Sequence, residues 1–220
     1  MGNYINNAPH KRAVRAIQMI AYLVLLGVLA TVVIFIAYSL KDRNSGDSYM
    51  FFITIVSSLL GSALHSAVGI SLPHSGKFDF YRIPAHAFII SDIIGVVYGL
   101  KTLTSNLRHP EDLLPMIFYL TFFLGLLVSN IIILRFYIGS VSRKTATVFV
   151  TVTTVLILLH LADILYYMFI RDNFEDSLPS KNNMIKLACN SVFLLTSIAS
   201  FIVIRIKPKE HYENDPLKFQ

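Results

Sequence analysis

Long runs of apolar residues, separated by short polar segments, make up most of this chain. Six such runs can be counted. Because the hydrocarbon core of a bilayer is about 30 Å thick and a helix rises 1.5 Å per residue, about 20 apolar residues are enough to cross it. Backbone groups in lipid must be paired within the segment, which favours helices. The expected spans cover residues 14–40, 49–71, 83–103, 113–134, 145–170 and 184–206.

The residues at the ends of these apolar runs support the predicted span boundaries. Pro84 and Pro115 fall in the first turns of the third and fourth spans, where a missing N–H costs no hydrogen bond. Arg135 closes the fourth. The third span is the shortest and carries Asp92, so whether it crosses the membrane completely is left open.

We therefore predict an all-α fold, a polytopic transmembrane helical bundle of about six spans over residues 14–206. Residues 1–13 would form a cytosolic N-terminal tail, and residues 207–220 a disordered cytosolic C-terminal tail. The composition agrees, because only 15% of the residues are charged, against about 25% in a soluble domain. No stretch remains for a separate soluble domain.

The distribution of Lys and Arg predicts the orientation. With the N-terminus inside, twelve of these residues lie in inner segments and seven in outer ones. This bias places both termini in the cytosol. The net charge of +6 reflects basic residues at span ends, so we expect no nucleic-acid partner. The expected location is the plasma membrane or an endomembrane. The expected partners are the lipid bilayer and either other membrane proteins or a second copy of the chain.

Four ionisable residues fall at membrane depth: His65, Asp92, His160 and Asp163. Such groups are costly in lipid and usually face the bundle interior, so they are the candidate polar cluster. A lone charged carboxylate is disfavoured there, and Asp92 should be protonated or paired. His160 and Asp163 are three residues apart on one helix, so Asp163 could accept the ring N–H of His160. Such a pair is typical of proton relays and metal sites.

Small and amide side chains predict where the helices pack closely. Three serines recur on the face of the second span that also carries His65, and Gly95 and Gly99 form a G-x-x-x-G pattern. Two asparagines should form hydrogen bonds between helices. The predicted packing residues are Ser58, Ser62, Ser66, Gly95, Gly99, Asn130 and Asn190.

A short segment before the first span resembles a known family. The sequence Arg-Ala-Val-Arg-Ala-Ile-Gln at 12–18 looks like the start of MARVEL-type tetraspan proteins. The resemblance covers under a tenth of the chain, and those proteins have four spans where six are expected here. It implies a membrane-organising role and carries over no site residues.

Three functions are compatible with these features. The first is a non-enzymatic protein that organises or assembles other components in the membrane. The second is a small proton-coupled transporter or channel that uses Asp92, His160 and Asp163. The third is a membrane-embedded metal or haem enzyme that uses His65, His86 and His160. No H-E-x-x-H or C-x-x-C-H motif is present, so we expect no cofactor and favour a non-enzyme, and a metal is left open.

Overall fold

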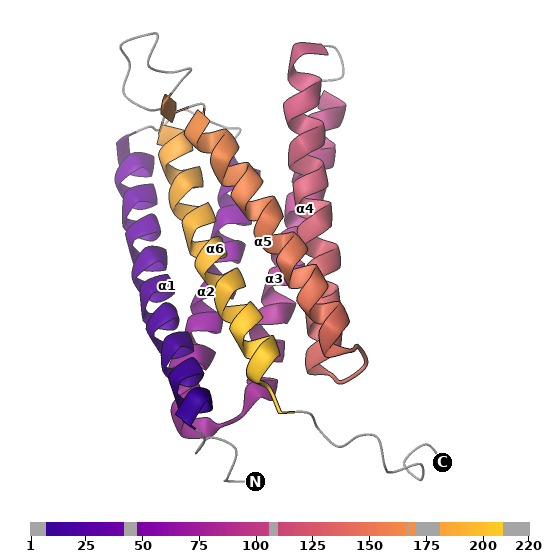
Figure 1. Cartoon of the computed structure of the whole chain (residues 1–220). Helices are drawn as coiled ribbons and strands as arrows, with labels where there is room; N and C mark the ends of the chain where they lie inside the picture. The colour runs from indigo at the N-terminus through magenta and orange to yellow at the C-terminus, as the bar shows by residue number, and fades with distance from the viewer. Residues whose placement is uncertain (1–7, 42–47, 106–109, 167, 170–180, 209–220) are drawn as a thin grey trace.

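The computed structural model of the chain describes residues 8–41, 48–105, 110–166, 168–169 and 181–208 (Figure 1). Over these residues the main elements are six long α-helices and one short 3-10 helix. They are α1 (Ala8–Lys41), α2 (Ser48–Ser75), η2 (Phe78–Tyr81), α3 (Arg82–Ser105), α4 (Pro110–Tyr137), α5 (Arg143–Tyr166) and α6 (Lys181–Ile206).

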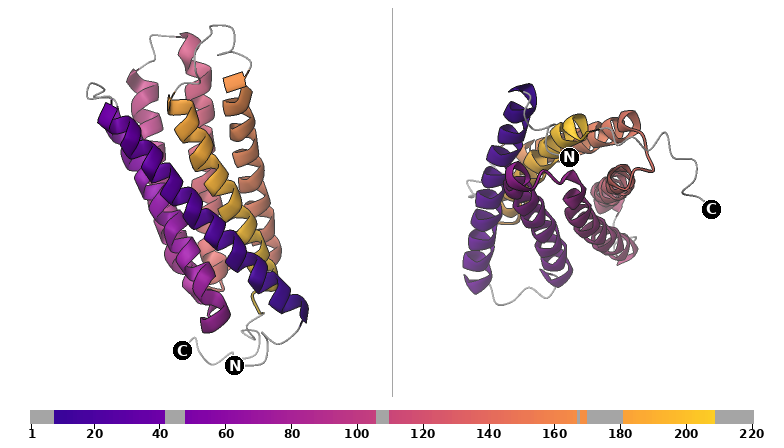
Figure 2. Two further views of the ribbon diagram at one scale, coloured as in Figure 1. Left: turned by 90° about the vertical axis from the view of Figure 1, so that its left-hand side faces the viewer. Right: turned by 90° about the horizontal axis from the view of Figure 1, so that it is seen from below.

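The six long helices form a ring. Each helix packs against the next one along the chain, and α6 returns to pack against α1 (Figure 2). A smaller contact joins α2 and α6. The helix α1 begins, and α6 ends, at the bottom of Figure 1. We call this the lower end of the bundle and the opposite side the upper end.

Two glycines in the left-handed region shape the turns at the lower end. Gly76 follows α2 with a φ of 61°, and its N–H donates to the carbonyl of Leu72 at 2.9 Å. Gly139 follows α4 with a φ of 88°. The N–H of Ser140 then closes the last turn on the carbonyl of Arg135 at 2.9 Å. Residues other than glycine rarely adopt this left-handed backbone conformation, so glycine allows the chain to reverse here.

Large apolar side chains cover the outside of the ring as well as its interior. On α1, Met19, Leu26 and Val33 are 68%, 62% and 65% exposed, and all six long helices carry exposed side chains of this kind. Such a surface is unfavourable in water and suits lipid. All six helices are also long and apolar enough to cross a membrane. The predicted six-helix membrane bundle is therefore confirmed, and the chain is a multi-pass membrane protein.

The helices follow the expected spans, with differences at the ends. The third span, whose crossing was left open, lies within α3, which is long and apolar enough to cross. The helix α1 already begins at Ala8, inside the expected N-terminal tail. Lys207, assigned to the disordered tail, is instead only 7% exposed. Residues 1–7 and 209–220 of the two tails, and residues 167 and 170 of the fifth span, lie outside the described residues.

Candidate functional site

A cavity of about 60 Å³ lies inside the ring, lined by α2, η2, α3, α4, α5 and α6. One buried water needs about 10–15 Å³ of such space, so about four water molecules would fit. We call this the lower cavity. Its apolar walls include several phenylalanines. Its polar lining residues are Ser58, His65, Tyr81, Asp92, Asn130, Tyr137, Thr153, Thr196, Ser197 and Ser200.

A buried carboxylate lies near the middle of the bundle. Asp92 is 4% exposed, and the amide Nδ2 of Asn130 donates to its Oδ2 at 2.7 Å, which joins α3 to α4. Asp92 is ten residues beyond Arg82, the first residue of α3, or about 15 Å along the helix axis. A carboxylate can accept about four hydrogen bonds. One amide therefore leaves most of its acceptor capacity for groups inside the lower cavity.

Three aromatic side chains of the lower cavity carry polar atoms that lack a partner. Within the described part of the protein, the Nε2 of His65 and the hydroxyls of Tyr81 and Tyr137 are buried without a hydrogen bond. The rings of His65 and Tyr81 meet edge to face at 5.0 Å, and those of Tyr81 and Tyr137 stack at 5.8 Å. Buried polar groups are nearly always paired. Water or a polar solute in the cavity would supply the missing partners.

A second cavity of about 50 Å³ lies closer to the upper end, lined by α2, α4, α5 and α6. We call it the upper cavity. His160 of α5 and Lys186 of α6 bring two ionisable groups to it, together with Asn190. The Asn190 Nδ2 donates to the carbonyl of Lys186 at 2.8 Å. Among the described residues, the Asn190 Oδ1 and the His160 Nδ1 are buried without a partner.

The two cavities share one wall. Ser58, Phe123 and Phe193 line both of them. Phe123 is held in place by close packing: its ring lies 4.7 Å from that of Tyr119, and it faces Gly95 so closely that a Cβ at position 95 would overlap it. A polar group that moved from one cavity to the other would therefore pass two phenyl rings and one hydroxyl.

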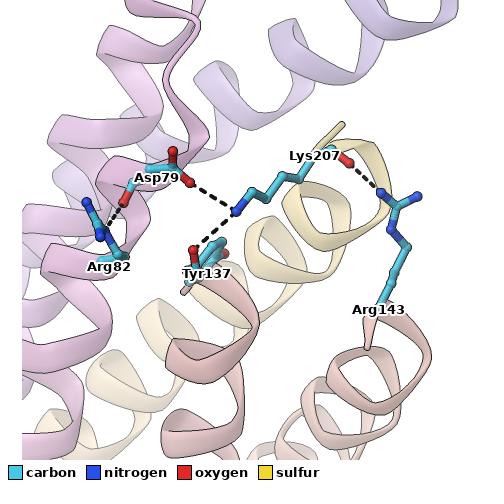
Figure 3. Close-up of polar contacts among 5 residues, drawn as sticks. All are labelled: Asp79, Arg82, Tyr137, Arg143 and Lys207. Carbon is cyan, nitrogen blue, oxygen red and sulfur yellow. Dashed lines mark hydrogen bonds and ion pairs between the residues drawn. The ribbon is translucent and has the colours of Figure 1, made fainter. Parts of the chain in front are cut away.

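A cluster of charged side chains ties the lower end of the bundle together (Figure 3). The Lys207 Nζ lies 3.0 Å from Asp79 Oδ1 and donates to the carbonyl of Tyr137 at 3.2 Å. Arg143 of α5 donates to the carbonyl of Lys207, and the Arg82 Nε donates to the carbonyl of Asp79 at 3.3 Å. These contacts connect η2, α3, α4 and α5 to the end of α6. They lie directly beside Tyr137, which lines the lower cavity.

The four residues of the predicted cluster do not share one site. His65 and Asp92 line the lower cavity, whereas His160 lines the upper one. Asp163 is exposed. No hydrogen bond joins it to His160, whose Nδ1 is unpaired among the described residues. The three-residue spacing had suggested such a pair, but the rotation of α5 turns Asp163 outward.

No metal or haem site is assembled from the predicted histidines. His86 is exposed and its Nδ1 contacts the carbonyl of Arg82 in its own helix at 2.7 Å. His65 and His160 belong to different cavities. In the part of the chain that the structure describes, no three side chains of His, Cys, Asp or Glu come together as metal ligands.

The predicted packing residues lie at several helix contacts. Ser58 shares a hydrogen bond with Ser91 of α3, and the Asn130 amide donates to Asp92. Gly95 and Gly99 face Phe123 and Leu120 of α4. Ser66 bonds the carbonyl of Ser62 within α2, and the hydroxyl of Ser62 is buried without a partner among the described residues. Asn190 bonds within α6.

Comparison with models of protein families, with curated protein sequences and with solved structures finds no match to this chain. The local resemblance to MARVEL-type proteins is thus unsupported by any family match, and the six-helix ring differs from a four-span fold.

Four residues of the two cavities and the lower end were not singled out from the sequence. Tyr81 and Tyr137 lie just outside the ends of expected spans, where aromatic residues are common at the membrane interface. Lys186 and Lys207 had been counted as topology signals. A weak signal existed for Lys186, because it is the third residue of the sixth expected span, where a lysine must reach either the membrane interface or a polar space.

Proposed function

We propose that this protein is a small proton-coupled transporter, in which Asp92 carries the proton and a small polar solute passes between the two cavities. The observation that carries the proposal is the position of Asp92. It is a buried carboxylate near the middle of the α3 span, on the wall of a cavity whose hydroxyl and imidazole groups include some with no hydrogen-bond partner among the described residues. An ionisable group at this depth is usually functional.

The two-cavity arrangement supports transport over a purely structural role for these side chains. Transporters commonly bind their solute near the bilayer midplane, between helices that can move against one another. Here the lower cavity and the upper cavity meet at Phe123 and Phe193. A movement of these rings would connect them, and the protonation state of Asp92 would change the charge of the lower cavity.

The test is proton uptake by liposomes that contain the purified protein and a trapped pH-sensitive dye. A potassium chloride buffer with valinomycin clamps the membrane potential, and amino acids, sugars and phosphate are present on both sides, because a coupled transporter moves protons only together with its solute. The external pH is then lowered in one step. We expect faster internal acidification than in protein-free liposomes, and a return to the protein-free rate in Asp92→Asn. The substitution keeps the shape of the side chain and an oxygen that can accept from Asn130.

Asp163→Asn is the matched control, because it removes a carboxylate that is exposed and lines neither cavity. It should keep a rate well above that of protein-free liposomes, and Asp92→Glu should keep part of the natural rate. A natural rate in folded Asp92→Asn would show that Asp92 does not carry the proton, and the proposal would then be wrong.

A second candidate is an organising role in the membrane, which the pairing of polar groups between helices favours. Ser58 bonds Ser91, and the hydroxyls of Thr154 and Ser197 meet at 2.7 Å. Both pairs serve helix packing without a solute. If the folded natural protein gave no proton flux above protein-free liposomes, this candidate would be preferred.

A further inference from the structure

A lysine side chain lines the upper cavity. Lys186 is half-buried on the second turn of α6 and lines this cavity. Within the described residues its ammonium group makes no hydrogen bond or ion pair. Asp163 of α5 interacts with Lys186 electrostatically, but it is exposed and forms no ion pair with it. Lys186 lies five residues after the start of α6, near the end of the membrane span, and a cation there with no counter-ion among the described residues makes the cavity that it lines attractive to an anion.

The hydrogen-bonding groups around Lys186 narrow the class of anion. Asn190 is 5% exposed, and its Nδ2 donates to a carbonyl, which can only accept. This fixes the orientation of the amide and leaves its Oδ1, an acceptor, without a partner in the part of the chain that the structure describes. The His160 Nδ1, which likewise has no partner among the described side chains, can donate in one tautomer. Besides the hydroxyl-bearing residues Thr54, Ser58 and Tyr119, the cavity thus offers a cation, an imidazole donor and an amide acceptor.

From these groups we infer that the upper cavity binds a small monovalent oxyanion that carries its own hydroxyl group, of the class of bicarbonate. The anionic oxygens would face Lys186 and His160, and the hydroxyl would donate to the Asn190 Oδ1. The size agrees, because a cavity of about 50 Å³ holds about three water molecules. The inference that such an anion is the transported solute rests on the proposed function. Binding of the anion can be measured without transport.

The experiment compares bicarbonate with nitrate. Both are planar anions of four heavy atoms, and only bicarbonate has a hydroxyl donor. The full chain is purified in detergent, and its Tm is measured at pH 8 in sealed vessels as either sodium salt replaces sodium gluconate at constant ionic strength. We expect a saturable rise in Tm with bicarbonate, of about 3–5 °C at ten times the Kd, and a weaker effect of nitrate.

Variants of the upper cavity identify the groups involved. Lys186→Gln should abolish the rise in Tm, and Lys186→Arg should keep it. Lys101→Gln is the control, because it removes an exposed lysine near the upper end of α3 that lines neither cavity. Asn190→Leu should lower the bicarbonate effect to that of nitrate. A merely structural role of Asn190 would not change the preference between the two anions.

Each outcome decides something. Equal effects of bicarbonate and nitrate on the natural protein would overturn the hydroxyl requirement. An unchanged bicarbonate effect in Lys186→Gln would overturn the site. If Lys186→Gln does not fold, the site is tested by two other variants. Asn190→Leu should lose the larger rise in Tm with bicarbonate than with nitrate, and Lys186→Arg should keep it. Anion binding that depends on Lys186, without proton flux, would support the anion site and contradict the proposed transport. Proton flux without anion binding would support transport and contradict the anion site.

Discussion

Lys207 and Asp79 form an ion pair of 3.0 Å in which only the lysine is buried: 8% of its side chain is exposed, against 47% for Asp79. The two partners are therefore not equivalent. Loss of Asp79 leaves a buried ammonium group, whereas loss of Lys207 leaves a carboxylate that is close to water. A charge left alone in a buried place is costly, and one left near water is not.

Asp79→Ala should consequently destabilise the protein more than Lys207→Met. The first leaves a buried ammonium with only the Tyr137 carbonyl, whereas the second leaves a half-exposed carboxylate and keeps an aliphatic side chain beside Phe136. We expect a loss of about 1–3 kcal/mol for Asp79→Ala, measured by thermal or denaturant unfolding in detergent. The opposite order of the two variants would mean that the lysine acts mainly by packing.

The hydrogen bond between Asn130 and Asp92 gives a second prediction about stability. Asn130→Ala removes the described partner of a buried carboxylate, so the free energy of unfolding should fall by about 1–3 kcal/mol. Ser191→Ala is a suitable control, because Ser191 is exposed and bonds only the Leu187 carbonyl of its own helix. If both substitutions had the same small effect, Asn130 would not stabilise Asp92.

Two glycines on one face of α3 should differ in their tolerance of a methyl group. A Cβ at Gly95 would overlap the ring of Phe123, whereas a Cβ at Gly99 would first meet a methyl group of Leu120 at 3.3 Å. Gly95→Ala should therefore cost about 1–3 kcal/mol and Gly99→Ala clearly less. Adding Phe123→Leu to Gly95→Ala should restore part of the loss. Equal unfolding energies for the two alanine variants would contradict the close α3–α4 contact.

The predicted cytosolic position of the lower end can be tested by cysteine labelling. Cys189 is 5% exposed and should react slowly, so single cysteines can be added elsewhere. Ser140→Cys lies in the lower turn between α4 and α5, and Thr104→Cys near the upper end of α3, both at exposed positions. When the protein is in the plasma membrane of intact cells, an impermeant maleimide should label the cysteine at position 104. The cysteine at position 140 should react only after the cells are permeabilised. Labelling in the reverse pattern would invert the orientation.

Hydrophobic patterning was enough to predict the helices, because a span must be long, apolar and paired within itself. The depth of Asp92 could be predicted for the same reason. What the pattern could not give was the rotation of each helix, which depends on packing against its neighbours. His160 and Asp163 are three residues apart, yet one faces the upper cavity and the other is exposed. Lys207 looked like part of a tail, because its partner Asp79 is distant in sequence.

The helix α1 packs against α2 and α6, and none of its described side chains lines the lower or the upper cavity. It therefore packs on the outside of the five helices that line the lower cavity, and this position has a practical use. A reporter group can be attached to its outward face, for example at Met19, which is 68% exposed, without entering the space where a solute would sit. Distances from such a label to the other helices would then follow their movements while leaving the cavities chemically unaltered.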